Sequence, residues 1–203
     1  MKKILVLNDL HAGSNYAPAM DHFVVDKISG EVKEFKASSL QKFMYNELQV
    51  IVAGNTYDAL VLNGDICEGP CEKNGGRYIM SADMNDQVNL AYKIIKDNIS
   101  YKRVFATMGT PYHAIDDRPL DFMVGELLNA TNKYDLLLEV EGKKIHFGHT
   151  MDYRGGVLDS LSRELGTCGA DLVVRGHRHE YGYVEKPKRK AVCAPCWQWR
   201  TNF

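Results

Sequence analysis

The chain has 203 residues, of which 45% are hydrophobic and 25% are charged, and its formal net charge is -1 at pH 7. A chain of this length can bury a sizeable core, and its composition favours neither a disordered protein nor a membrane protein. The near-zero net charge gives no global reason to expect a polyanion as partner.

The first half of the chain alternates apolar runs with segments of helical periodicity, the pattern of a layered α/β domain. In chain order, we expect a strand over 3–8, an inserted hairpin near 22–36, a helix over 38–52, a strand over 59–64, a loop over 69–79 and a helix over 81–98. The hairpin is indicated by Ser29-Gly30 between two β-favouring runs, and Ser81 or Asp83 can cap the helix that follows the loop.

The second half continues the alternation and adds a second hairpin. We expect, in order, a strand over 102–108, a helix over 118–130, strands over 135–141 and 143–148, a helix over 157–166 and a strand over 171–176. Glu141-Gly142 forms the hairpin turn, and Asp117 with Pro119 starts the preceding helix. Because the sequence shows neither a repeat nor a convincing linker, residues 1–203 are predicted to form one domain.

Histidines and aspartates gather where the predicted strands end. Five of the seven histidines follow a strand, and so do two aspartates. These residues are Asp9, His11, Asp65, His113, His149, His177 and His179. Open α/β sheets collect their ligands at the carboxyl ends of strands, so we expect these side chains to meet at one site.

Two short motifs, Asp9-x-His11 and His177-x-His179, each place two side chains on one side of an extended segment, where both can face one ion. A set of imidazoles and carboxylates without thiolates suits Mn, Fe, Zn or Ni at a catalytic site rather than a closed structural zinc site. The candidate ligands outnumber what one open ion site needs. We therefore predict two divalent ions about 3.5 to 4 Å apart, with Asp65 as a shared ligand.

The order of these motifs resembles that of the calcineurin-like metallophosphoesterase superfamily. The matching elements are DxH at 9–11, GD at 64–65, a turn from Gly109 to His113, GH at 148–149 and GHxH at 176–179. They follow the family's order over nearly the whole chain. The resemblance implies a four-layered α/β/β/α sandwich of two mixed sheets.

The resemblance also implies how the site works. One ion would be held by Asp9, His11, Asp65 and His179, and the other by Asp65, His149 and His177. A hydroxide that bridges the ions would attack phosphorus in line, without a covalent phosphoenzyme. Manganese is the expected metal, with iron, nickel and zinc as alternatives.

The third motif departs from the family's Gly-Asn-His, in which the asparagine binds the second ion and the histidine meets the leaving oxygen. The chain has Gly109-Thr110-Pro111-Tyr112-His113 instead. Three explanations stay open: Thr110 replaces the asparagine directly or through a water, His113 is itself a ligand, or the second ion is held weakly. We favour His113 as the catalytic residue and Thr110 as a weak or water-mediated ligand.

Loops around the site are the expected source of substrate selection, in particular the hairpin at 22–36 and the loop at 69–79. Arg77 and Arg154 lie on loops that can approach the site, and we predict that they bind the phosphate group. Asn8 and Asn63 flank the metal motifs, where they either orient ligands or serve core hydrogen bonding.

The five cysteines are an odd number in a chain that has its own core, which argues against a disulfide framework and for a cytoplasmic location. Cys193 and Cys196 form a CxxC and are expected to be core or near-surface thiols of a final strand. A zinc site shared with Cys67 and Cys71, and a redox pair, are the alternatives. No apolar run approaches the roughly 20 residues of a membrane helix, so no membrane partner is expected.

The leading hypothesis is a two-metal-dependent phosphoesterase that hydrolyses a phosphodiester or a phosphomonoester. Diesterase or nuclease-like activity, with a nucleotide or nucleic acid as substrate, is favoured by the resemblance alone. A protein phosphatase is one alternative, but Gly69 stands where its GDxxDR motif has arginine. A non-catalytic metal-binding scaffold is the other. The sequence does not indicate the natural substrate or the oligomeric state.

Overall fold

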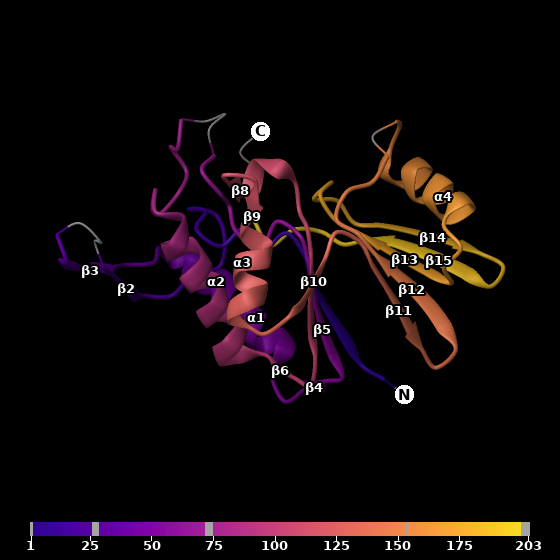
Figure 1. The fold of residues 1–203 in the computed structure, drawn as a ribbon, viewed down its shortest axis with the longest axis horizontal. Helices are drawn as coiled ribbons and strands as arrows, with labels where there is room; N and C mark the ends of the chain where they lie inside the picture. Colours follow the sequence, from indigo (N-terminus) through magenta and orange to yellow (C-terminus); the bar gives the residue numbers. More distant parts are fainter. Residues whose placement is uncertain (1, 26–28, 72–74, 153, 200–203) are drawn as a thin grey trace.

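Two sheets form the centre of the molecule in the computed structural model, which describes residues 2–25, 29–71, 75–152 and 154–199 (Figure 1). The first sheet has the strand order β1 (Ile4–Leu7), β5 (Ala59–Asn63), β7 (Val104–Thr107) and β10 (Thr131–Lys133). The second has the order β11 (Leu136–Val140), β12 (Lys143–Phe147), β13 (Leu172–Arg175), β15 (Arg189–Cys193) and β14 (Gly182–Lys186).

Helices cover the outer faces of both sheets. The first sheet carries α1 (Ser39–Val52), α2 (Met84–Asn98) and α3 (Leu120–Leu127), and the second carries α4 (Val157–Thr167) (Figure 1). The predicted α/β/β/α sandwich is therefore confirmed. It differs from the expectation in one detail, because all described pairs of the first sheet are parallel and only the second sheet is mixed. Each connection within the first sheet contains a helix, and such crossovers join parallel strands.

Three core layers follow from the alternation of side chains along the strands. Leu60 and Leu62 of β5 are fully buried among residues of the first-sheet helices. Val61, between them, faces the second sheet and packs with Phe147 of β12. On the far side of the second sheet, Val173 packs against α4. Because these three core layers cover both faces of each sheet, β1, β5 and β13 have apolar residues on both faces.

The inserted hairpin and several shorter pairs complete the topology. Strands β2 (His22–Val25) and β3 (Val32–Phe35) pair antiparallel, as predicted for 22–36. The short pairs are β4 (Thr56–Tyr57) with β6 (Ser100–Tyr101) and β8 (Ala114–Ile115) with β9 (Arg118–Pro119). In the described ranges, no helix combines the length and the apolar character needed to cross a bilayer.

Helix boundaries follow their capping residues. Ser38 caps α1 in a capping box with Gln41, and Asp83 rather than Ser81 caps α2. Helix α3 is shorter than the predicted 118–130, and Asp117 does not start it, because β9 occupies Arg118–Pro119 and Pro119 stands at the N-cap. The final strand ends at Cys193, so Cys196 lies beyond it and not in the strand as expected.

Candidate metal centre

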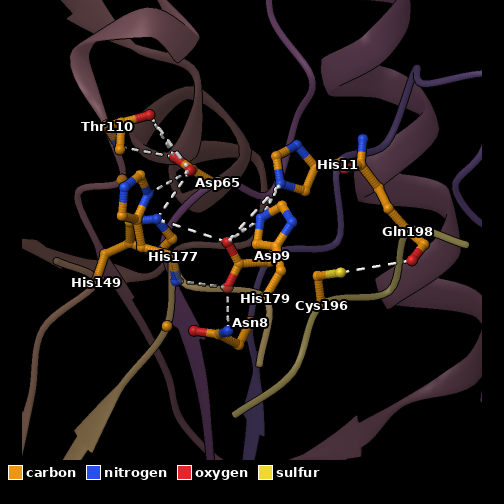
Figure 2. A network of polar contacts seen from close by, with 12 residues as sticks. Asn8, Asp9, His11, Asp65, Thr110, His149, His177, His179, Cys196 and Gln198 are labelled. Atoms are coloured by element: carbon orange, nitrogen blue, oxygen red, sulfur yellow. Dashed lines mark hydrogen bonds and ion pairs between the residues drawn. The ribbon is translucent and has the colours of Figure 1, made fainter. Parts of the chain in front are cut away.

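Six of the predicted ligands lie together where β1, β5, β12 and β13 end (Figure 2). They form two groups, in each of which the ligand atoms lie within 4.8 Å of one another. The first group is Asp9, His11 and His179, and the second group is Asp65, His149 and His177. The carboxyl ends of both sheets therefore meet at one site, as the motif order predicted.

Close contacts join the two groups. In the second, Asp65 Oδ2 lies 2.8 Å from His149 Nε2 and 3.9 Å from His177 Nδ1. In the first, Asp9 Oδ1 lies 3.2 Å from His179 Nε2. The same Asp9 oxygen is 3.6 Å from His149 Nε2, so Asp9 links the groups. That Asp65 is shared between two ions stays a prediction.

The donor set fits divalent cations. Asp9 Oδ1 is buried without a hydrogen-bond donor among the described residues, although imidazole nitrogens of His179, His149 and His11 surround it at 3.2, 3.6 and 3.8 Å. A buried carboxylate oxygen that imidazole nitrogens surround, but that accepts no hydrogen bond by geometry, is well placed to bind a cation. None of the five cysteines forms a disulfide, and among the described residues no cysteine belongs to a group that could hold a metal ion. The structure therefore gives no support to the four-cysteine zinc site in the part of the chain that it describes.

The backbone at these residues is unusual. Five of the six have a left-handed conformation, with positive φ at Asp9 (47°), His11 (50°), Asp65 (49°), His177 (67°) and His179 (54°). A positive φ is uncommon outside glycine, although Asp and His adopt it more readily than most residues, and it costs free energy. The chain turns sharply after β1, β5 and β13 and thereby directs these side chains towards one point.

A chain of hydrogen bonds through Asn63 and Asn8 connects to residues of both groups. Thr107 Oγ1 donates to Asn63 Oδ1 (3.0 Å), and Asn63 Nδ2 donates to Asn8 Oδ1 (3.1 Å). The amide of Asn8 in turn donates to Asp9 Oδ2. The Asn63 carbonyl lies 2.8 Å from His149 Nδ1. Asn8 and Asn63 therefore orient ligands, the first of their two expected roles.

Thr110 and His113 both reach the second group. The Thr110 amide donates to Asp65 Oδ1 at 2.7 Å, and its Oγ1 lies 3.2 and 3.3 Å from the two oxygens of that carboxylate. His113 Nε2 lies 3.4 Å from Asp65 Oδ2, and its Nδ1 contacts the Glu68 carbonyl oxygen. Since that contact needs a proton on Nδ1, the neutral ring presents an Nε2 lone pair to the site. Burial lowers the pKa of His113, which favours the neutral ring.

Comparison with known proteins identifies the fold. No protein-family model and no curated protein matches the chain. Vps29 from Chaetomium thermophilum matches with a TM-score of 0.53 at 10% identity, over 98% of this chain and 74% of that one. A structure described as a novel archaeal phosphodiesterase matches with a TM-score of 0.52 at 13% identity, over 96% and 84%.

A single mutant of Vps29 from Entamoeba histolytica gives a TM-score of 0.51 at 11% identity, over 98% of this chain and 77% of that one. The chain has the calcineurin-like phosphoesterase fold. At these identities the likeness shows the fold alone. The matching structures include two described as Vps29 and one described as a phosphodiesterase, so the fold by itself does not indicate an activity for this chain.

Two further carboxylates, which the sequence analysis did not identify, contact residues in or beside the two groups. Glu68 Oε2 lies 2.9 Å from His11 Nδ1. Asp121 accepts the backbone N–H groups of Ile66 and Gly109, both at 2.8 Å. Burial, together with the charge of Asp65, raises the pKa of Asp121 to about 6. Asp121 could have been found from the sequence because it is a carboxylate inside the otherwise apolar helix α3. Glu68 could have been found because it lies three residues after Asp65.

The two predicted phosphate-binding arginines are not part of the cluster. Arg77 is exposed and shares no hydrogen bond or ion pair with either group in the described part of the chain. Arg154 Nη2 lies 2.7 Å from Asp152 Oδ2, and the Arg154 side chain is 84% exposed. Asp152 also pairs with Arg163. Both arginines stay predictions as substrate contacts, and Arg154 is held by a competing carboxylate.

Gly64 is a position where an added side chain would disturb the second group. Its φ is +82°, and an added Cβ would lie 2.5 Å from His149 Cγ, whereas Gly142, at φ +74°, has nothing within 4 Å of its own. We expect Gly64→Ala to lower the free energy of unfolding by about 2 kcal/mol more than Gly142→Ala, because only the first adds overpacking to backbone strain. Urea unfolding of both variants measures this difference. Equal losses would show that His149 moves aside at no cost.

Metal binding is expected to release protons. Burial works to lower the pKa values of His149 and His179, but Asp65 beside His149 and Asp9 beside His179 outweigh it and raise both from 6.5 to about 9. Each imidazolium therefore stabilises the metal-free protein fully below pH 6.5, and this stabilisation is lost as the pH rises towards 9.

Because ions bind only neutral imidazoles, we expect Mn²⁺ added at pH 7 to displace these protons and to bind more tightly as the pH rises. Calorimetric titration in buffers of different ionisation enthalpy counts the protons. Binding without proton release would contradict the charged state of these two histidines.

Proposed function

We propose that this chain is a two-metal-dependent phosphoesterase that hydrolyses a phosphodiester, such as one in a nucleotide or nucleic acid, and more weakly a phosphomonoester. The observation that carries the proposal is the pair of Asp/His groups that Asp9 Oδ1 links at 3.2 Å to His179 and at 3.6 Å to His149. Manganese is the proposed metal, and the same donors suit iron, nickel and zinc.

Each group would hold one ion, with Asp65 as the shared ligand. Two such ions, when bound, lower the pKa of a water molecule and neutralise the charge that develops on the phosphate oxygens. The protein positions them rigidly, because Asn8 fixes Asp9 and Thr110 fixes Asp65 through hydrogen bonds.

His113 is placed beside this charge, with Nε2 facing Asp65 and Nδ1 anchored on Glu68. Its proposed role is to stabilise or protonate the leaving oxygen, which requires the ring to carry a second proton when substrate is bound. Arg77, on the loop expected at 69–79, is a proposed phosphate contact. Arg154 would first have to leave Asp152.

Turnover of bis-p-nitrophenyl phosphate by metal-stripped protein, before and after addition of Mn²⁺, Ni²⁺, Co²⁺ or Zn²⁺, tests the proposal. We expect activity only after metal addition, and a faster reaction on this diester than on p-nitrophenyl phosphate. Two bound ions without turnover on either ester would favour the scaffold hypothesis, whereas hydrolysis restricted to a phosphopeptide would favour a protein phosphatase.

A cytoplasmic location is part of the proposal. The five cysteines form no disulfide, and two of them are buried, which fits a reducing compartment.

A further inference from the structure

The segment 194–199, which follows β15, runs back across the first group. The Trp197 amide donates to the Asp9 carbonyl at 2.9 Å, and the Trp199 amide donates to the Tyr16 carbonyl at 2.9 Å. The Ala194 carbonyl accepts from Asn8 Nδ2 at 3.3 Å. These bonds fix the backbone of the segment at several points beside the loop that carries Asp9.

The side chain of Gln198, a residue of this segment, lies beside the first group on the side of His11 (Figure 2). It is 9% exposed, and its Nε2 donates to Glu68 Oε2 at 2.7 Å and to Ser14 Oγ at 3.1 Å. Glu68 Oε2 is also the atom that lies 2.9 Å from His11 Nδ1. One carboxylate oxygen therefore receives the Gln198 amide on one side and the His11 ring on the other.

This relay determines how His11 faces the first group. Since His11 Nδ1 faces Glu68, Nε2 is the ring nitrogen that faces the first group, where it lies 3.8 Å from Asp9 Oδ1 and 3.2 Å from His179 Nε2. Without the Gln198 amide, Glu68 Oε2 would lose the donor that lies 2.7 Å from it on the side away from His11. Carboxylates that orient metal-binding imidazoles are themselves usually hydrogen-bonded.

We infer that Gln198 is a positioning residue for the first ion, acting through Glu68 on His11, so that the segment 194–199 tunes the affinity of the first group and not of the second. The inference rests on the proposed function, since it takes the first group to be an ion site. It assigns a role to a glutamine more than 180 residues away from the ligand that it positions.

Calorimetric titration of metal-stripped protein with Mn²⁺ tests this assignment. In a His177→Ala background, where only the first group is complete, we expect Gln198→Ala to weaken binding by about 10-fold to 100-fold. In a His179→Ala background, where only the second group is complete, the same substitution should leave the affinity unchanged. Gln49→Ala removes an exposed amide that bonds Asn98 on α2, and this matched control should change neither titration.

A double-mutant cycle tests the route through Glu68. Once Glu68→Ala has removed the relay, Gln198→Ala should cause no further loss of affinity. Gln198→Glu keeps the side-chain volume but lacks the donor, so it should weaken the first ion even if Gln198→Ala lowers the melting temperature of the metal-free protein.

Unchanged affinity in both Gln198 variants, equal weakening of both ions, or additive losses with Glu68→Ala would each overturn the inference. A wild-type chain that binds no ion would overturn the proposed function as well, so the two failures are distinguishable.

Discussion

Asp65→Asn is expected to lower turnover by roughly a thousandfold, about 4 kcal/mol of transition-state stabilisation, and to remove the second ion. Asp65 Oδ2 lies 2.8 Å from His149 Nε2 and 3.4 Å from His113 Nε2, at the centre of the second group. Burial works to raise the pKa of Asp65, but the charges of His113 and His149 outweigh it and hold that pKa well below its ordinary value. The substitution therefore removes a full negative charge.

Asparagine is chosen because it adopts the left-handed backbone of Asp65 (φ 49°) with little strain. The measurements are kcat at saturating Mn²⁺ and the number of ions bound per chain. Asp117→Asn is the matched control, since Asp117 is exposed and also left-handed (φ 63°). If Asp65→Asn kept wild-type turnover with two bound ions, Asp65 would not be the shared ligand.

His113→Ala is expected to lower turnover about a hundredfold or more while both ions stay bound. The reason is the position of its Nε2, which faces Asp65 without belonging to either ligand group. Metal content per chain separates the two roles, because loss of an ion would make His113 a ligand instead. His22→Ala, on the hairpin where the ring stacks with Phe35, is the control.

The pH dependence of kcat is a second test of the role of His113. The neutral ring offers a lone pair at Nε2, so donation to a leaving oxygen requires the doubly protonated ring. Wild-type kcat should then fall as the pH rises through the pKa of His113, and His113→Ala should lack that fall. Identical profiles would exclude the acid role and leave charge stabilisation or ligation.

The sequence predicted most of the fold and the clustering of the Asp and His side chains because both depend on local signals. Apolar runs predicted the strands that are buried on both faces. The His and Asp residues directly after these strands predicted where the site lies. Strand β14 was missed because its GYVEK pattern has little continuous apolar character, and three of its five residues are exposed at the edge of the sheet. Asp117 was mistaken for a helix start because the β8–β9 turn that contains it has the same polar residues as a cap.

Contacts between distant segments explain what the sequence did not reveal. Asp121 lies in the apolar helix α3, and only the folded chain brings it to the N–H groups of Ile66 and Gly109. Gln198 is equally remote from Glu68. The replacement of the family's asparagine by Thr110 was visible, but its hydrogen bonds to Asp65 depend on the turn that Pro111 begins.

The left-handed backbone at five of the six cluster residues has a consequence for how this chain can change. Glycine at any of these positions would relieve the backbone strain, but it would also remove a side chain that takes part in the carboxylate–imidazole contacts of the cluster. A substitution there therefore exchanges relief of strain for loss of those contacts.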